Sequence, residues 1–213
     1  MNVIVVGENS FIGKNFIRYS VNTIVKEVSL VTSKPYEIDF TNTDVLLYLV
    51  AIVHQTKRIP ECDYFRINHD LCIETAINAK KTGVKQFVFL STIKVYGQFK
   101  SNYDPWTETS ECLPDDSYGR SKYKAEIELK KLEDENFTIS IIRTPLVYGE
   151  GVKANMLSII KLVELFPLLP FGNTINKRYF TYIENLVSYI DRIIEKRASG
   201  VFIAMDQSPV STT

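Results

Sequence analysis

Two side chains in the segment YGRSKYKAEIELKKL have the types and the spacing of a base and its activating cation. Tyr118 and Lys122 lie four positions apart among strong helix formers, so a helix would place them on one face. An ammonium beside a phenol stabilises the phenolate. Lowering a tyrosine pKa from about 10 to working pH requires roughly 4 kcal/mol, which this lysine and one further cation could supply. The pair therefore predicts a tyrosine that acts as a base.

Chance also produces such pairs. With 12 tyrosines in 213 residues about one is expected by accident, and Tyr96 with Lys100 is a second one. That second pair lies near Gly97 and Pro105, which break a helix, whereas Ser117 can cap the helix of the first pair. The first pair is therefore the functional candidate, and a solvated helix face is its alternative interpretation.

Short apolar runs alternate with helical patterns along the chain. The runs are rich in Val, Ile and Phe without strict polar alternation, which is typical of strands buried on both faces of a parallel sheet. Strands are expected at 2–6, 28–31, 44–51, 86–91, 138–143 and 200–205, and helices from about residue 13, over 71–81, from Tyr118 to near Asn136, over 156–166 and over 185–196. Alternating strands and helices predict a doubly wound α/β fold.

A glycine-containing loop follows the first predicted strand in VIVVGENSFIGKNF. Gly7 ends the strand and Gly13 opens a helix, so backbone amides and a helix N-terminus could approach a pyrophosphate. The loop predicts a dinucleotide site, with a simple turn as the alternative. A triphosphatase loop is excluded because the spacing is one residue too long and Asn15 stands where Ser or Thr would hold magnesium.

Composition narrows the class of protein. The formal net charge is +0 and the sequence pI is about 6.7, so charge gives no support for binding to nucleic acid or to an anionic membrane. The start MNVIVVG lacks signal-peptide features, and the longest apolar run, VLLYLVAIV, is too short to span a bilayer; a cytoplasmic protein is expected. Three cysteines without CxxC spacing and two histidines predict no metal site, and the cysteines are expected to be buried.

Taken together, these motifs resemble the extended short-chain dehydrogenase/reductase family, in particular its NAD-dependent nucleotide-sugar epimerases and dehydratases, which include UDP-glucose 4-epimerases. The long matching segments are RTPLVYGEG and KRYFTYIENL, and Thr92 stands three residues before VYG as in the family pattern. The resemblance implies a Rossmann domain over residues 1–213. Because family members are longer, residues of about 146–178 are expected to form only a partial substrate lobe, interleaved with that domain.

The resemblance also assigns roles to residues. Catalysis is expected from Thr92, Tyr118 and Lys122. Cofactor contacts are expected at Gly7, Ser10, Phe11, Ile12, Gly13, Asp39, Phe40, Leu49, Val50, Ala51, Tyr118, Lys122 and Pro145. A UDP- or dTDP-sugar is expected to contact Thr92, Asn155 and Arg178, the last of which could instead form a surface ion pair with Glu184.

The implied reaction is epimerisation. Tyr118 would take a proton from a sugar hydroxyl while hydride passes to the nicotinamide, Thr92 would donate a hydrogen bond to the oxygen, and hydride would return to the opposite face. A dehydratase would need an acidic pair directly after Thr92, where Ile93 and Lys94 stand, so elimination is disfavoured and Lys94 is expected to be a surface charge. A keto-sugar reductase and a non-catalytic dinucleotide sensor remain alternatives.

The sequence leaves open the choice between NAD and NADP, the affinity for the cofactor and the oligomeric state. The predicted second strand ends in VTSK without an acid for the ribose, and Lys34 could accept a 2′-phosphate, so NADP is an alternative to NAD. Ser10 places a side chain where a glycine is usual, which weakens the prediction of cofactor affinity. Apolar residues on the helices around 68–81 and after Tyr118 suit either a homodimer face or plain core packing.

Overall fold

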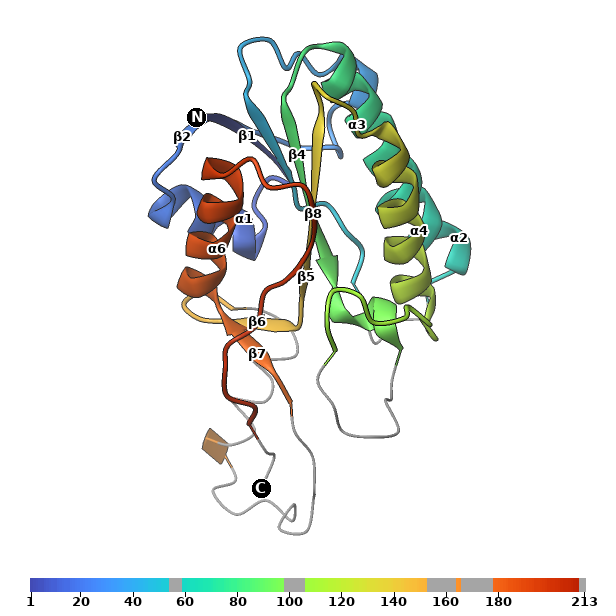
Figure 1. Cartoon of the computed structure of the whole chain (residues 1–213), viewed down its shortest axis with the longest axis vertical. Helices are drawn as coiled ribbons and strands as arrows, with labels where there is room; N and C mark the ends of the chain where they lie inside the picture. The colour runs from blue at the N-terminus through green and yellow to red at the C-terminus, as the bar shows by residue number, and fades with distance from the viewer. Residues whose placement is uncertain (54–58, 98–105, 153–163, 166–177, 211–213) are drawn as a thin grey trace.

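The computed structural model describes residues 1–53, 59–97, 106–152, 164–165 and 178–210. These residues form a three-layer α/β structure in which a parallel sheet lies between two layers of helices (Figure 1). The strands of the sheet run in the order β2-β1-β3-β4-β5-β8. They are β1 (Asn2–Val6), β2 (Thr23–Val28), β3 (Val45–Tyr48), β4 (Gln86–Thr92), β5 (Thr138–Thr144) and β8 (Gly200–Ile203). The prediction of a doubly wound α/β fold is confirmed.

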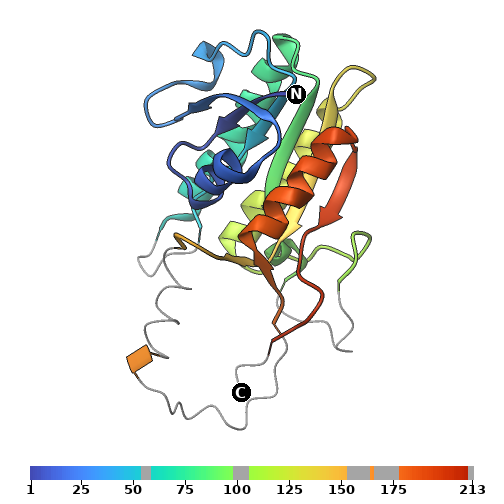
Figure 2. The ribbon, with the colours of Figure 1, turned by 90° about the vertical axis from the view of Figure 1, so that its left-hand side faces the viewer.

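Helices cover both faces of the sheet, as Figure 2 shows from the side of α1 and α6. On one face α3 (Leu71–Lys81) and α4 (Ser117–Leu132) pack their small and apolar residues against Tyr48, Phe87 and Phe89. On the other face α1 (Phe11–Tyr19) and α6 (Ile183–Glu195) pack against the opposite side chains of the same strands. The central strands are therefore buried on both sides, which explains their uninterrupted apolar sequences.

Smaller elements complete the described chain. They are the 3-10 turns η1 (Pro35–Glu37) and η3 (Ile93–Tyr96), the short helix α2 (Glu61–Phe65), the π-helical turn η2 (Arg66–Asp70), and the strands β6 (Leu146–Tyr148) and β7 (Phe180–Tyr182). The last two form a separate parallel pair below the main sheet in Figure 1. Most of the predicted substrate lobe at 146–178, including all but residues 164–165 of the helix expected over 156–166, lies outside the described residues.

The prediction was wrong for the second strand. It lies at Thr23–Val28 instead of 28–31, because β2 is an edge strand whose exposed Lys26 interrupts the apolar run that the pattern sought. Where β1 pairs with β2, the register shifts between Val3 and Ile4. An edge strand has one partner and tolerates polar side chains, so hydrophobicity alone locates it poorly.

Helix α4 is attached to the sheet by a buried ion pair. Glu126 and Arg143 of β5 are 1% and 3% exposed, and the Arg143 guanidinium donates to both carboxylate oxygens, at 2.6 Å in the shortest bond. Ser91 of β4 donates to the same carboxylate at 2.5 Å. Arg143 also donates to the hydroxyl of Tyr96 at 2.8 Å and stacks on its ring. The carboxylate therefore joins α4 to two strands at the level of the residues predicted to be catalytic.

Replacing Glu126 with Gln should destabilise the fold strongly. The change leaves the buried Arg143 guanidinium without its counter-charge, and breaking such a pair costs about 3–5 kcal/mol. The measurement is the midpoint of urea unfolding. As a matched control, Glu61→Gln breaks the exposed pair with Arg120 and should cost at most about 1 kcal/mol. Equal losses in the two variants would contradict the role given to the buried pair.

Candidate functional site

The predicted site residues gather at one edge of the sheet. Gly7, Leu49, Thr92 and Pro145 lie at or directly beyond the carboxyl ends of β1, β3, β4 and β5, and parallel strands place these ends together. The sheet order reverses between β1 and β3, since β2 lies on one side of β1 and β3 on the other. Open α/β sheets bind ligands in the crevice at such a switch point.

The glycine loop has the close packing that a phosphate-binding loop needs. Gly7 has φ of 129°, and a side chain there would meet the Cβ of Leu49 at 3.0 Å and its main chain at 3.2 Å. The glycine loop therefore lies directly against the chain that follows β3. The residues of that chain, Leu49, Val50 and Ala51, are half-buried. Glycine is required at this position both by the backbone conformation and by the space.

Ser10 has a role that the sequence did not reveal. It is the N-cap of α1, and its hydroxyl accepts the amide of Gly13 at 3.0 Å. A side chain at Gly13 would meet this hydroxyl at 2.6 Å, so the two residues depend on each other. Helix α1 begins at Phe11, two residues earlier than predicted, and Phe11 and Ile12 in its first turn pack on the core. The helix N-terminus faces the loop, with one of its amides already bonded to Ser10.

The residues predicted near the adenine end lie in different surroundings. Asp39 is exposed and accepts the amide of Thr41 at 2.9 Å. Phe40 is 0% exposed and belongs to the core under β3, so a contact of this residue with a cofactor would have to use its main chain. The role of Phe40 stays a prediction, and its side chain has a structural function.

An acid that the sequence analysis overlooked lies near the end of β2. Glu27 comes 20 positions after Gly7, the spacing at which Rossmann proteins place an acid for the ribose. Its Oε1 is buried and has no hydrogen-bond partner among the described residues. Lys34, the candidate for a 2′-phosphate, lies beyond β2 with its ammonium 3.8 Å from Glu37. The sequence analysis did not identify Glu27 because it placed the second strand at 28–31, after this residue.

Tyr118 lies near Thr92, beside the carboxyl end of β4. The helix begins at Ser117, and its N-cap is Asp116 instead of the predicted Ser117, with a carboxylate oxygen accepting the amide of Gly119 at 2.6 Å. This start places Tyr118 in the first turn, close enough to Thr92 for that hydroxyl to lower the pKa of the phenol. Thr92 is 7% exposed and ends β4.

The charge state of Tyr118 differs from the expectation. Burial raises the pKa of its phenol to about 12; the neighbouring Thr92 opposes this rise and the charge of Asp116 adds to it. We expected Lys122 to lower this pKa, but its ammonium lies 3.9 Å from the centre of the Phe89 ring, and burial, Thr92 and Asp116 are the influences that set the pKa of the phenol. The side chains of the described site therefore hold the tyrosine protonated.

Lys122 is a buried cation at the centre of the site. It is 1% exposed, and burial lowers the pKa of its ammonium to about 8 against the raising effects of Cys72 and Glu126. Within the described chain it forms no salt bridge, since the Glu126 carboxylate is bound to Arg143. A buried ammonium of this kind requires oxygen acceptors, and ribose hydroxyls would provide them. Together with the glycine loop, this environment fits a dinucleotide.

Asn68 is a site residue that the sequence analysis did not single out. It is 0% exposed within η2, and its amide bonds both main-chain groups of Ile52, at 2.7 Å and 3.0 Å, and the hydroxyl of Ser121 at 3.0 Å. The side chain thus connects the loop after β3 to the helix of Tyr118 and Lys122. A polar residue in a predicted helix gives no sequence signal of burial, so this connection becomes visible only in the fold.

The predicted substrate residues are only partly placed. Thr92 lies in the crevice, and Asn155 lies outside the described residues. Arg178 is exposed, and its main chain pairs with Val210 through bonds of 2.9 Å and 2.8 Å. The alternative of an ion pair between Arg178 and Glu184 is not seen in the described part, where Glu184 accepts the hydroxyl of Tyr182.

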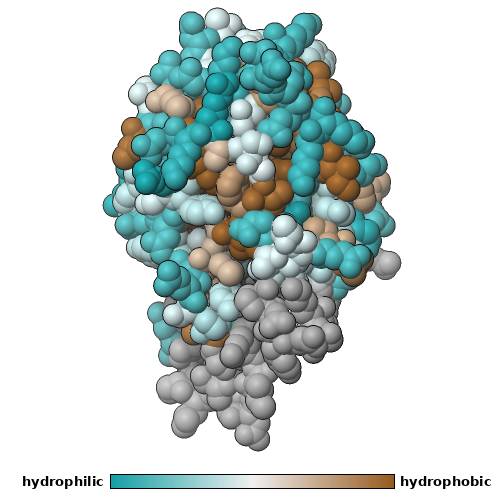
Figure 3. Space-filling view, viewed as in Figure 1, coloured by the Kyte–Doolittle hydropathy of each residue, from teal (hydrophilic) through white to brown (hydrophobic). Residues whose placement is uncertain are grey.

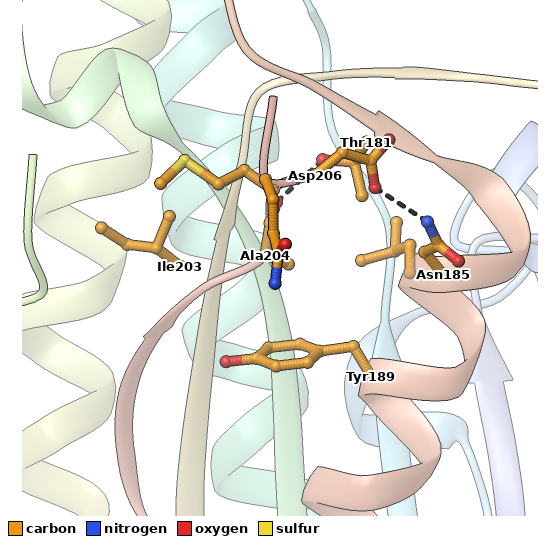
Figure 4. Close-up of a pocket in the computed structure, with 9 residues that line it drawn as sticks. Thr181, Asn185, Tyr189, Ile203, Ala204 and Asp206 are labelled. Atoms are coloured by element: carbon orange, nitrogen blue, oxygen red, sulfur yellow. Dashed lines mark hydrogen bonds between the residues drawn. The ribbon is translucent and has the colours of Figure 1, made fainter. Parts of the chain in front are cut away.

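A separate cavity of about 480 Å³ lies between α6 and the segment that follows β8 (Figure 4). Asp206 lies on its wall, where its carboxylate accepts Asn185 Nδ2 and the amide of Tyr182, both at 2.9 Å. The lining residues are Thr181, Asn185, Leu186, Tyr189, Ile203, Ala204, Met205, Asp206 and Gln207. None of them belongs to the predicted site.

Other predictions concern metals, membranes and cysteines. Across the described ranges no group of His, Cys, Asp or Glu side chains could hold a metal ion. None of the helices described is long and apolar enough to cross a membrane. Cys72 is buried as predicted, but Cys62 is exposed and Cys112 is half-buried.

Comparison with known proteins agrees with this arrangement. Residues 3–203 match the model of the NAD dependent epimerase/dehydratase family. A UDP-glucose 4-epimerase of Vibrio cholerae is 36% identical over 96% of the chain, and an N-acetyl-alpha-D-glucosaminyl-diphospho-ditrans,octacis-undecaprenol 4-epimerase of Escherichia coli O157:H7 is 24% identical over 93%. The UDP-glucuronic acid 4-epimerase of Bacillus cereus, solved with NAD, superposes with a TM-score of 0.82 at 18% identity, covering 99% of this chain and 79% of that structure.

The chain is shorter than the curated relatives that it matches. It spans 66% of the length of the Vibrio cholerae protein and 65% of that of the Escherichia coli protein. The family match covers most of the chain and includes the glycine loop, Thr92, Tyr118 and Lys122. The chain belongs to the NAD dependent epimerase/dehydratase family.

Proposed function

We propose that this protein is an NAD-dependent epimerase of nucleotide sugars, acting on a UDP-linked sugar at carbon 4. The observation that carries the proposal is the position of Tyr118 and Lys122 on α4, beside the carboxyl end of β4, where Thr92 lies. The substrate class and the carbon are suggested by the printed activities of the two curated relatives. The sensor alternative is tested below through Tyr118.

In the proposed reaction Tyr118 exchanges a proton with a sugar hydroxyl, and Thr92 donates a hydrogen bond to the oxygen as charge develops. Lys122 binds ribose hydroxyls and keeps positive charge in the crevice. NAD, when bound, supplies the hydride acceptor and a positively charged ring that favours the phenolate. The phenolate needs this help, because burial by the chain alone holds the pKa of Tyr118 near 12.

The cofactor is proposed to be NAD and not NADP. Glu27 has a buried carboxylate oxygen without a partner among the described residues, which suits a 2′-hydroxyl and would repel a 2′-phosphate. The ammonium of Lys34 is close to Glu37, which reduces its value as a phosphate ligand. Arg178 is proposed to bind the substrate diphosphate, because its exposed guanidinium is suited to phosphate oxygens.

A homodimer through α3 and α4 is part of the proposal. Ile77 and Ile127, on these two neighbouring helices, are 50% and 41% exposed, so both helices carry apolar surface that a second copy could cover. Figure 3 shows that most of the viewed face is hydrophilic, with separate hydrophobic patches that include the side of these helices. Burying such residues against a second copy would remove apolar surface from water.

Tyr118→Phe should abolish epimerisation and leave NAD binding intact. Without the phenolic oxygen there is no group to exchange the proton, and loss of a general base reduces turnover by about 10²–10⁴-fold. The measurement is product formation from UDP-glucose, beside NADH fluorescence for binding. Tyr123→Phe on the same helix is the control and should stay active. Full activity of Tyr118→Phe would refute the proposed mechanism, whereas an inactive parent protein that still binds NAD would favour the sensor.

Ser10→Gly should move stability and cofactor affinity in opposite directions. Loss of the cap on Gly13 costs only a few tenths of a kcal/mol when the replacement is glycine, but it frees that amide for a phosphate oxygen. We expect NAD to bind about five- to ten-fold more tightly, equivalent to about 1–1.4 kcal/mol. Calorimetric titration with NAD measures this, and weaker binding would show that the Ser10 hydroxyl is itself a ligand.

A further inference from the structure

A carboxylate that the proposed mechanism does not use lies at the N-terminus of α6. Asp206 follows β8, and its two oxygens accept the amide of Tyr182 and Asn185 Nδ2, each at 2.9 Å; the second bond is drawn in Figure 4. Tyr182 is the N-cap of α6, and its own side chain forms no capping hydrogen bond. Asp206, 24 positions further along the chain, thus places a negative charge at this helix end, which the helix dipole favours.

The main chain around Asp206 is bonded to the segment that begins with Arg178. The amide of Asp206 donates to the carbonyl of Phe180 at 2.9 Å. Arg178 and Val210 exchange two main-chain hydrogen bonds, of 2.9 Å and 2.8 Å, in an antiparallel bridge. The two segments therefore form a short antiparallel ladder, which runs from Tyr182 beside Asp206 to Arg178 beside Val210.

This ladder is attached to the edge of the sheet that carries the predicted site. Thr181 Oγ1 lies 3.1 Å from Thr144 Oγ1 at the carboxyl end of β5, and it donates to the carbonyl of Ala204 at 2.8 Å. Both threonines are buried. Three residues of extended chain span about 10 Å, so the main chain of Arg178 lies within that distance of Thr181. The ladder therefore determines where the guanidinium of Arg178 starts from.

We propose that Asp206 is a positioning residue, whose carboxylate fixes the ladder and so holds Arg178 where its guanidinium binds the diphosphate of the substrate. The inference rests on the proposed function for the role of Arg178, but the effect on the ladder requires no ligand. Positioning and simple charge predict opposite results. Removing a negative charge favours the binding of an anion, whereas removing a residue that positions Arg178 weakens it.

The experiment compares ligands with and without phosphates. UDP is titrated into the whole protein by calorimetry, and uridine is titrated by NMR. In Asp206→Ala we expect UDP to bind about ten-fold more weakly, because the guanidinium of Arg178 no longer meets both phosphates. Uridine and NAD should bind as they do to the native protein, which also shows that the variant is folded. If the protein converts UDP-glucose, KM should rise while kcat stays nearly unchanged.

A conservative variant and a matched control separate positioning from loss of charge. The oxygen of an asparagine can still accept the amide of Tyr182, and the exposed Asn185 can turn its own amide to accept the new NH2 group. Asp206→Asn should therefore bind UDP within about two-fold of the native protein. Glu184→Ala removes another carboxylate from the first turn of α6, where it accepts the hydroxyl of Tyr182, and should leave UDP binding unchanged. Tighter binding in Asp206→Ala, or equal losses in the alanine and asparagine variants, would overturn the inference.

The other end of the ladder provides a test that leaves Asp206 and α6 untouched. Val210→Pro removes the amide that donates to the carbonyl of Arg178 at 2.8 Å, and it should weaken UDP binding, whereas Val210→Ala should not. A double variant shows whether Asp206 acts through Arg178. In the Arg178→Met background, Asp206→Ala should weaken UDP binding clearly less than in the native background. Equal losses in both backgrounds would refute the inference.

Hydrogen exchange distinguishes failure of the inference from failure of the proposed function. NMR without ligand follows the amides of Arg178 and Val210, which should exchange about ten-fold faster in Asp206→Ala and at the native rate in Glu184→Ala. Faster exchange in a protein that binds no UDP would support the role of Asp206 in the ladder and refute the proposed function. Unchanged exchange, or native UDP binding that Asp206→Ala does not weaken, would refute the inference alone.

Discussion

The carboxylate of Glu126 is the constraint on which the geometry of this site depends. Tyr118, Lys122 and Glu126 follow one another at intervals of four along α4, so they lie on one helix face, and the last of them is bound to β5 by Arg143 and to β4 by Ser91. These bonds fix how far Tyr118 and Lys122 lie along the direction of the strands. Asn68 adds a second connection from the other side, between Ser121 and the loop after β3.

Burial has opposite effects on the two predicted catalytic groups. It raises the pKa of Tyr118 to about 12 and lowers that of Lys122 to about 8, because desolvation disfavours the charged form of each. The chain by itself thus stabilises a neutral phenol and weakens the positive charge of the amine. Both shifts would be reduced by neighbours that stabilise the charged forms, so the reactivity of the pair depends on Thr92 and on the bound ligand.

Much of the fold could be predicted because the central strands are buried on both faces. β1 and β4 contain the apolar runs VIVV and FVFL, β5 is apolar apart from Ser140 and Arg143, and α3 was predicted at its observed bounds. The parallel arrangement then brings Gly7, Leu49, Thr92 and Pro145 to one edge without further information. The local sequence was sufficient to locate those strands that are buried on both faces of the sheet.

The remaining features depend on contacts between residues far apart in the chain. The pair of Glu126 with Arg143 spans 17 positions, and Asn68 reaches Ser121 across 53, so neither has a local pattern. The role of Ser10 as a cap was hidden for a different reason: its position was compared with a glycine of the family, and not with the helix start beside it. The charge state of Tyr118 required knowledge of burial, which spacing does not provide.

The edge of the sheet at β2 has a consequence for the behaviour of the protein at high concentration. An exposed strand edge offers unpaired backbone groups to other chains, and natural proteins protect it with lysines and irregular register. Here Lys26 is exposed on that strand and donates to the carbonyl of Asp39 at 2.8 Å, and the register with β1 shifts between Val3 and Ile4. An added strand would meet the charge of Lys26 and a strand whose register is irregular, so self-association by sheet extension is disfavoured at this edge.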